Sequence, residues 1–340
     1  MKIEKLFGRF DYDLNFDNED GVTILTGPNG FGKTTILNSI DSAVKRNFGF
    51  FDDLPYKKID FIYNNNVMES VTNLNGFHLL EGCNDDVFAG FSGTLLFLSD
   101  QRIYDLKTPF KQTISALPNE LQETIKQAAT KYSEESNKLD GTYTKRLMES
   151  ADGISEQQYN ELTAEAKSKF EKLSKYNLVN LEPFTAAKYD EKYANTLKIY
   201  FDDFDKKYSI FADLITKLEL FTNIINSRLL FKSVKISPEK GFFAESDKGD
   251  ELDLAALSSG EKQEIILFFN LIFNADKDTL LLIDEPELSL HVTWQHNFIQ
   301  DLIDVAKLNS FKAIVATHSP QIIAGRWDLQ IDLGEIYNGE

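Results

Sequence analysis

The chain has 340 residues, of which 42% are hydrophobic and 26% are charged, as in an ordinary globular protein. This length is enough to bury the core of one large domain or two. The net charge of −18 argues against nonspecific nucleic-acid binding by the whole surface, because an acidic surface repels phosphate backbones. A local basic patch stays possible, and solubility is the simpler explanation of the acidity.

The sequence also indicates in which cellular compartment the protein works. The single cysteine, Cys83, excludes an intramolecular disulfide, which fits a reducing environment. The opening residues MKIEKLFGRFDYDL contain no apolar stretch of signal-peptide length, and no window reaches the roughly 18 uninterrupted apolar residues of a membrane span. We therefore expect a cytoplasmic protein with no membrane partner.

The first motif follows a short β-branched segment. Residues 21–26, GVTILT, predict a strand that runs into GPNGFGKTT at residues 27–35, and helical residues follow. This stretch matches the P-loop pattern G-x-x-x-x-G-K-[ST], in which glycines let backbone N–H groups face phosphates. Lys33 supplies a positive charge to the β- and γ-phosphates, and the Thr34 hydroxyl reaches Mg²⁺. The predicted nucleotide-binding residues are Gly27, Pro28, Asn29, Gly30, Phe31, Gly32, Lys33, Thr34 and Thr35.

A further apolar strand is predicted within TLLFLSDQR, residues 94–102. Gln101 follows this strand. A glutamine at such a position can coordinate Mg²⁺ and the attacking water, so we count Gln101 as a candidate ligand.

The middle of the chain has helical patterns. Residues 118–138 start with a proline and contain no glycine, and residues 155–174 open with Ser155 and Gln158 at capping-box spacing. Apolar residues then recur every three or four positions over 204–229, which predicts one amphipathic helix of about 25 residues.

These patterns predict how the chain is divided. We interpret residues 107–230 as a mostly helical insertion between an N-terminal lobe, residues 1–106, and a C-terminal lobe, residues 231–340. The apolar stripe of the insertion packs within the insertion or, alternatively, binds a partner.

Residues 257–261, LSSGE, precede the apolar run IILFFNLIF. Ser258 and Glu261 have the S-x-x-E spacing of a capping box, in which both side chains bond the first N–H groups of a helix. A helix that starts with Ser-Ser-Gly also offers an anion its serine hydroxyls and free N–H groups. The local spacing is compatible with both interpretations.

Two apolar strands near the C-terminus end in polar residues, which is typical of buried parallel strands with chemistry at their tips. Asp284 ends the run LLLID and can hold Mg²⁺, while Glu285 can orient or deprotonate an attacking water. His318 follows the strand predicted in FKAIVATHS. Its imidazole can hydrogen-bond a γ-phosphate or hold the water.

The order of these motifs resembles that of an ABC-type ATPase, with P-loop, Q-loop, signature, Walker B, D-loop and histidine switch. LSSGE followed by DEPELSLH and ATHSP resembles the soluble branch that contains RecF, Rad50, SMC and the OLD-family ATPases, including those of bacterial anti-phage systems. The resemblance implies an α/β P-loop NTPase fold of ABC-ATPase type, with a mixed β-sheet and the mostly helical insertion.

In that family ATP is held between two subunits. The resemblance implies that Ser258, Ser259 and Gly260 act in trans, in a homodimer that binds two molecules of Mg·ATP. No aromatic residue is evident to stack on adenine, and Arg9 is the candidate for the base or the phosphates. The implied catalytic residues are Glu285, His318, Gln101 and Lys33. The implied metal ligands are Thr34, Gln101 and Asp284.

Four functions stay possible. The first is an ATPase whose ATP-bound dimer, alone or in a larger assembly, controls a separate effector such as a nuclease in anti-phage defence. This function is suggested by OLD-like motifs that occur here without an attached Toprim nuclease domain. The second is a RecF- or Rad50-like ATPase that clamps DNA. We rank this function lower, because an acidic protein repels the DNA backbone. A transporter ATPase and a nucleotide-dependent scaffold with negligible turnover are the others.

Overall fold

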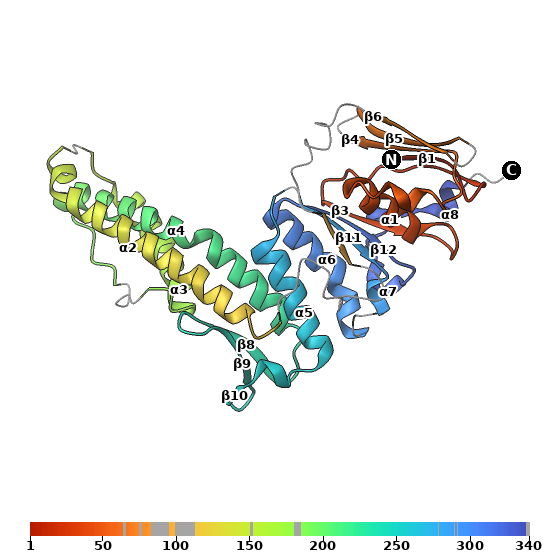
Figure 1. Ribbon diagram of the computed structural model, residues 1–340. Coiled ribbons are helices and arrows are strands. Elements are labelled where there is room, and N and C mark those ends of the chain that lie inside the picture. The colour runs from red at the N-terminus through yellow and green to blue at the C-terminus, as the bar shows by residue number, and fades with distance from the viewer. Residues whose placement is uncertain are drawn as a thin grey trace. The chain divides into compact units, whose positions relative to one another are not determined.

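The computed structural model describes residues 1–63, 66–74, 77–82, 95–98, 113–149, 152–179, 185–277, 279–288, 290 and 292–337. The chain divides into two compact units, drawn in Figure 1. The first unit comprises Met1–Lys111 and Leu267–Glu340, and the second comprises Gln112–Ile266. Each helix in the described part of the chain is too short or too polar to span a lipid bilayer.

A five-stranded sheet with the order β13-β3-β12-β11-β7 lies at the centre of the first unit. The strands are β3 (Val22–Thr26), β7 (Leu95–Leu98), β11 (Leu280–Asp284), β12 (Lys312–Ala316) and β13 (Gln330–Asp332). All neighbours pair in parallel, and the three central strands are buried at nearly every position, as the apolar runs predicted. The register aligns Leu25, Ala316 and Asp284, so three strands end together at one edge.

A second, antiparallel sheet of the first unit has the order β2-β1-β4-β5-β6. Its strands are β1 (Lys2–Leu6), β2 (Phe10–Asp13), β4 (Lys58–Tyr63), β5 (Asn66–Leu74) and β6 (Phe77–Gly82). The predicted mixed sheet is therefore two sheets, one parallel and one antiparallel. A common apolar core joins Ile59 of the antiparallel sheet, Ile36 of α1 (Lys33–Val44) and Ile314 of the parallel sheet.

Three further α-helices that lie wholly in the first unit come from the C-terminal part of the chain. They are α6 (Val292–Asn309), α7 (Pro320–Ile323) and α8 (Leu333–Ile336). The buried side of α6 includes Phe298, Ile299 and Leu302, and this helix packs against β3. The apolar spacing of these residues explains why the segment forms a helix that covers the sheet.

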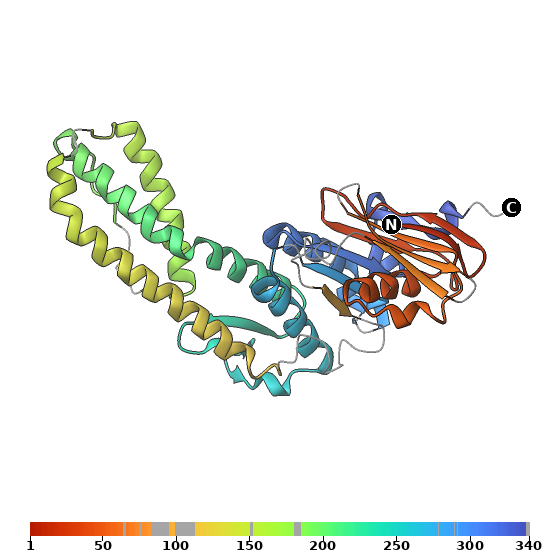
Figure 2. The same cartoon turned by 45° about the horizontal axis from the view of Figure 1, so that its top comes forward.

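Three long helices build most of the second unit: α2 (Leu117–Glu149), α3 (Glu156–Lys175) and α4 (Ala194–Asn226). In Figures 1 and 2 α2 and α4 lie side by side, and the guanidinium of Arg146 binds both carboxylate oxygens of Asp203 across them, at 2.6 and 2.7 Å. The predicted capping box of Ser155 and Gln158 is present at the start of α3. All three predicted helices are confirmed, with α2 and α4 longer than their sequence patterns.

The second unit continues past α4 into a small antiparallel sheet of β8 (Lys232–Ser237), β9 (Gly241–Ser246) and β10 (Glu251–Leu252). The side chain of Asn226, the last residue of α4, donates to the carbonyl of Val234 at 3.0 Å and accepts its N–H at 2.6 Å. This link joins α4 to the small sheet, and the compact unit extends to Ile266, within α5 (Ser259–Phe269). A π-helix, Asn270–Asn274, follows α5.

Candidate nucleotide site

The P-loop joins β3 to α1, and two of its glycines have backbone angles and close neighbours that disfavour a side chain. Gly32 precedes α1 with φ +92°, and a Cβ there would lie 2.8 Å from Leu6 Cδ2. Gly27 has φ +142°, and its Cβ would lie 3.1 Å from Cβ of Leu333. Because L-residues rarely adopt these angles, the glycines allow the loop to turn tightly against its neighbours.

The side chain of Lys33 is buried inside the loop. Its Nζ lies 2.7 Å from the carbonyl oxygen of Gly27 and 3.4 Å from that of Pro28. The ammonium group therefore stands at the N-terminus of α1, where the helix dipole also favours an anion.

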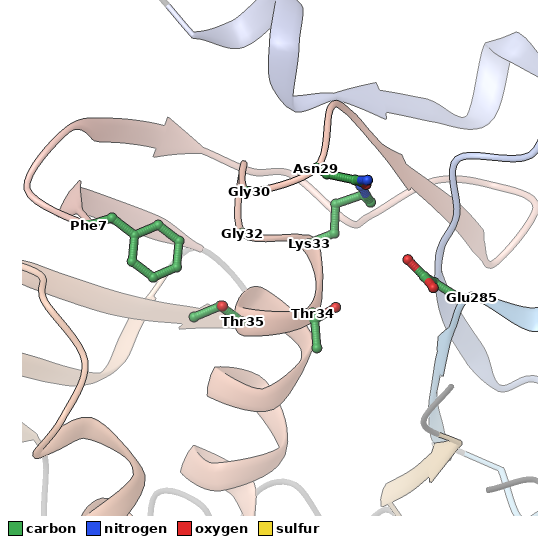
Figure 3. Close-up of a pocket in the computed structure, with 8 residues that line it drawn as sticks. All are labelled: Phe7, Asn29, Gly30, Gly32, Lys33, Thr34, Thr35 and Glu285. Carbon is green, nitrogen blue, oxygen red and sulfur yellow. The ribbon is translucent and has the colours of Figure 1, made fainter. Parts of the chain in front are cut away.

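A pocket of about 220 Å³ opens beside this loop, as Figure 3 shows. It is lined by Phe7, Asn29, Gly30, Gly32, Lys33, Thr34, Thr35 and Glu285. The structure thus brings the P-loop and the predicted water-activating glutamate, which are far apart in sequence, to one pocket.

Aromatic side chains anchor the outer turn of the P-loop. The Tyr12 hydroxyl donates to the carbonyl of Phe31 at 2.9 Å, and burial raises the pKa of Tyr12, so the hydroxyl stays a donor. The ring of Phe31 packs against Phe10 and Tyr337, with centroids 4.9 and 5.9 Å away. Arg9 donates from Nε to the Tyr337 hydroxyl at 2.8 Å and does not line the pocket. Arg9 therefore belongs to this aromatic anchor.

Phe7 is a pocket residue that the sequence did not reveal. It lies in the turn between β1 and β2, with φ +54°, and its side chain is 40% exposed. A phenylalanine with a left-handed backbone is uncommon, and such strain concentrates at functional positions. Gly8 marks the turn in the sequence, whereas the approach of this turn to the P-loop depends on the tertiary fold. The ring of Phe7 lines the pocket beside the P-loop.

Glu285 reaches the pocket because the backbone turns sharply at the end of β11. Its φ is +46°, and its N–H donates to the carbonyl of Ala316 on the neighbouring strand at 2.8 Å. Figure 3 shows the carboxylate directed toward the P-loop. Asp284, one residue earlier, is buried at the strand end. Of these two adjacent carboxylates, only that of Glu285 is among the residues that line the pocket.

His318 lies beside two glutamates. Its Nδ1 is 3.2 Å from Oε1 of Glu287 and 3.8 Å from Oε1 of Glu285. Glu287 also accepts the Thr317 hydroxyl, at 2.7 Å, and the His318 backbone N–H, at 3.2 Å. In the sequence, Glu287 is one residue of the DEPELSLH stretch. Its contact with the histidine was not visible in the pattern.

The oxygen groups of the site fit a magnesium ion. Mg²⁺ prefers oxygen ligands and is commonly held by one or two carboxylates together with substrate phosphates. The Thr34 hydroxyl opens α1, and the Asp284 carboxylate ends a strand that stops level with β3. Gln101, the third predicted ligand, and His291 of the D-loop lie outside the described residues.

The signature residues lie in the second unit. The Ser258 N–H donates to Oε2 of Glu261 at 2.9 Å, and the Ser258 hydroxyl accepts the Glu261 N–H at 3.3 Å, so the predicted capping box is confirmed. Burial raises the pKa of Glu261, but hydrogen bonds from Ser258 and Lys232 outweigh it and hold the pKa below its usual value. Ser258 and Ser259 are exposed, and among the described residues beyond its own helix turn no heavy atom lies within 4 Å of a Cβ built on Gly260. The capping box therefore leaves this surface accessible.

Comparison with known families identifies the chain. The model of the AAA ATPase domain matches residues 1–323. The chain belongs to the AAA ATPase domain family. It is accordingly an ATPase of the P-loop type, and the parallel sheet with its P-loop pocket is the centre of this AAA ATPase domain.

Two curated relatives share part of the AAA ATPase domain. Protein ea59 of Escherichia phage lambda is 28% identical over 130 residues, which cover 35% of this chain and 25% of that protein. The retron Ec83 probable ATPase of Escherichia coli is 27% identical over 147 residues, which cover 41% of this chain and 27% of that protein. The chain thus spans about a quarter of the length of these relatives.

Two solved structures were also compared with the AAA ATPase domain. The Smc head domain of Pyrococcus furiosus, with an extended coiled coil and bound to the C-terminal domain of ScpA, has a TM-score of 0.38 and 16% identity, over 95% of this chain and 90% of that chain. UvrA2 of Deinococcus radiodurans has a TM-score of 0.36 and 16% identity, over 93% of this chain and 32% of that chain.

Proposed function

We propose that the chain hydrolyses ATP in the pocket beside the P-loop. The observation that carries this proposal is the Glu285 carboxylate, which faces the P-loop across a pocket that also contains Lys33 and Thr34. Hydrolysis of a phosphoanhydride needs charge stabilisation and a positioned water, and these residue types supply both.

The individual roles follow from the chemistry of each group. Lys33 exchanges its bonds to loop carbonyls for bonds to the β- and γ-phosphates, while the ring of Phe7 stacks on the base. Thr34 and Asp284 hold Mg²⁺, which when bound neutralises charge on the phosphate oxygens. The Glu285 carboxylate accepts a proton from the attacking water, and His318 holds that water.

The proposal includes a homodimer that closes around two ATP molecules, with the signature of each copy at the P-loop of the other. Ser258 and Ser259 are exposed at the start of a helix and offer hydroxyl groups for such a contact. Leu288 and Val292, close to Glu285 in sequence, are 63% and 66% exposed, as expected of apolar residues that a partner covers. A twofold dimer uses each surface twice.

We further propose that this dimer controls a separate effector protein, such as a nuclease, in bacterial anti-phage defence. The OLD-like order of the motifs supports this role, as does the similarity to a protein named as a retron ATPase. Purification of the chain together with the products of its neighbouring genes tests the role. A chain that purifies alone, in both the presence and the absence of ATP, contradicts it.

Substitution of a signature serine tests the shared site. Ser258→Arg introduces bulk and charge at the proposed dimer contact, so we expect ATP binding by monomers without ATP-dependent dimers or turnover. Ser133→Arg is the matched control, because Ser133 is an exposed serine of α2 in the same unit. Light scattering with and without ATP, and a phosphate-release assay, measure the two effects. Wild-type turnover in Ser258→Arg contradicts the trans assignment.

A further inference from the structure

We propose that Glu287 is a positioning residue that keeps the proton of His318 on Nδ1 and leaves Nε2 as the acceptor nitrogen of the ring. This inference rests on the proposed role of His318 in holding the attacking water. It assigns the two glutamates of the DEPE stretch separate tasks, in which Glu285 serves the water and Glu287 serves the histidine.

The contacts of one carboxylate oxygen support the tautomer. The Glu287 side chain is only 9% exposed, and its Oε1 accepts the Thr317 hydroxyl and the His318 backbone N–H. An ionised carboxylate has acceptor oxygens and no donor, so a ring nitrogen in contact with it is favoured in its protonated form. Nδ1 of His318, 3.2 Å away, is therefore the ring nitrogen that carries the proton. The hydrogen bond on one nitrogen decides the state of the other, as in metal and triad sites.

Both ends of this contact are held by the fold. Gln295 of α6 is buried, and its side-chain amide donates to the carbonyls of Glu287 and Leu290 at 3.2 and 3.1 Å. On the other side Thr317 is fully buried, and its hydroxyl oxygen accepts the Ser319 N–H at 3.0 Å. The carboxylate therefore joins the tips of two adjacent parallel strands in a fixed geometry.

The distances also indicate what Glu287 prevents. Nδ1 of His318 is 3.8 Å from Glu285, beyond hydrogen-bond length, while Glu287 is closer at 3.2 Å. Without Glu287 the nearest described carboxylate is that of Glu285, and a bond between the two would occupy the group that must accept the proton of water. Loss of Glu287 thus lowers turnover even though Glu287 is not among the residues that line the pocket.

Nuclear magnetic resonance of ¹⁵N-histidine-labelled full-length protein reads the tautomer directly. The chain has four histidines, and the His318→Ala spectrum assigns the resonances. We expect His318 of the wild type to carry its proton on Nδ1, and Glu287→Ala to shift it toward the Nε2-protonated form. We also expect Glu287→Ala to lower kcat by about 10- to 100-fold with little change in KM for ATP, as for other groups that orient an active side chain. Glu19→Ala, which removes an exposed glutamate of the same unit, is the control and retains both properties.

Glu287→Gln separates charge from hydrogen bonding, because the amide keeps an acceptor oxygen. We expect it to retain the Nδ1 tautomer and to lose less kcat than Glu287→Ala. An Nε2-protonated His318 in the wild type overturns the inference without the need for any variant, and so does a Glu287→Ala protein with wild-type kcat. A wild-type protein without turnover overturns the proposed function instead, and the spectrum then decides the tautomer on its own.

Discussion

Replacement of Glu264 tests the electrostatics of the signature helix. The carboxylate is buried in α5 at 3% exposure, and its Oε2 lies 3.2 Å from the guanidinium of Arg228, just after α4. Burial raises the pKa of Glu264 from 4.5 to about 8, although Arg228 opposes the rise. The native state therefore holds this proton more tightly than the unfolded chain does.

The sign and size of the pH dependence follow from this shift. For an acid with a raised pKa, the stabilising contribution is complete below the unfolded value of 4.5 and is lost as the pH rises through about 8. At 1.36 kcal/mol for each unit, the loss between pH 5 and pH 8 is on the order of 3 kcal/mol. Glu264→Gln carries a neutral amide at every pH, so this part of the dependence disappears from the variant.

The assay is urea unfolding at pH 5 and pH 8, followed by far-ultraviolet circular dichroism, which the long helices of the second unit dominate. We expect the wild type to lose about 3 kcal/mol more than Glu264→Gln between the two pH values. Glu134→Gln, which alters an exposed glutamate of α2, is the control and behaves like the wild type. Identical pH dependence of the wild type and Glu264→Gln refutes the reasoning.

Three further substitutions test the pocket. Lys33→Ala removes the charge inside the P-loop, and we expect calorimetry to detect no ATP binding; unaltered affinity contradicts the assignment. Glu285→Gln removes the base but keeps the binding contacts, so kcat falls by about 10²–10⁴-fold while ATP-bound dimers accumulate in light scattering; wild-type turnover contradicts it. Phe7→Ala removes the stacking ring, and we expect KM for ATP to rise roughly tenfold with kcat retained; an unchanged KM excludes Phe7 from base binding.

The features that could be predicted from the sequence are those that depend on local patterns. The strand before Gly27, the apolar strand ending at Asp284 and the capping box at Ser258 each depend on neighbours within a few residues, and each is confirmed. The separation into a parallel and an antiparallel sheet was not visible in the pattern, because the parallel pairs join segments far apart in the chain.

Contacts between distant segments account for what the sequence missed. Phe7 reaches the pocket through the approach of a turn to the P-loop, and Glu287 meets His318 because β11 and β12 end level with one another. Likewise, the side chain of Asn226 joins the end of α4 to β8. Periodicity and spacing carry no information on such pairings.

The central claim is that each active site is shared between two copies of the chain, and mixing two inactive variants tests it directly. Lys33→Ala retains the signature, and Ser258→Arg retains the P-loop, so a mixed dimer contains one complete site. Neither variant is expected to form ATP-bound dimers alone, so the dimers that form in an equal mixture are mixed and have one of two sites intact, which predicts recovery of up to about half of wild-type turnover. If the mixture stays as inactive as its components, or if Ser258→Arg alone turns over ATP at the wild-type rate, the account is contradicted.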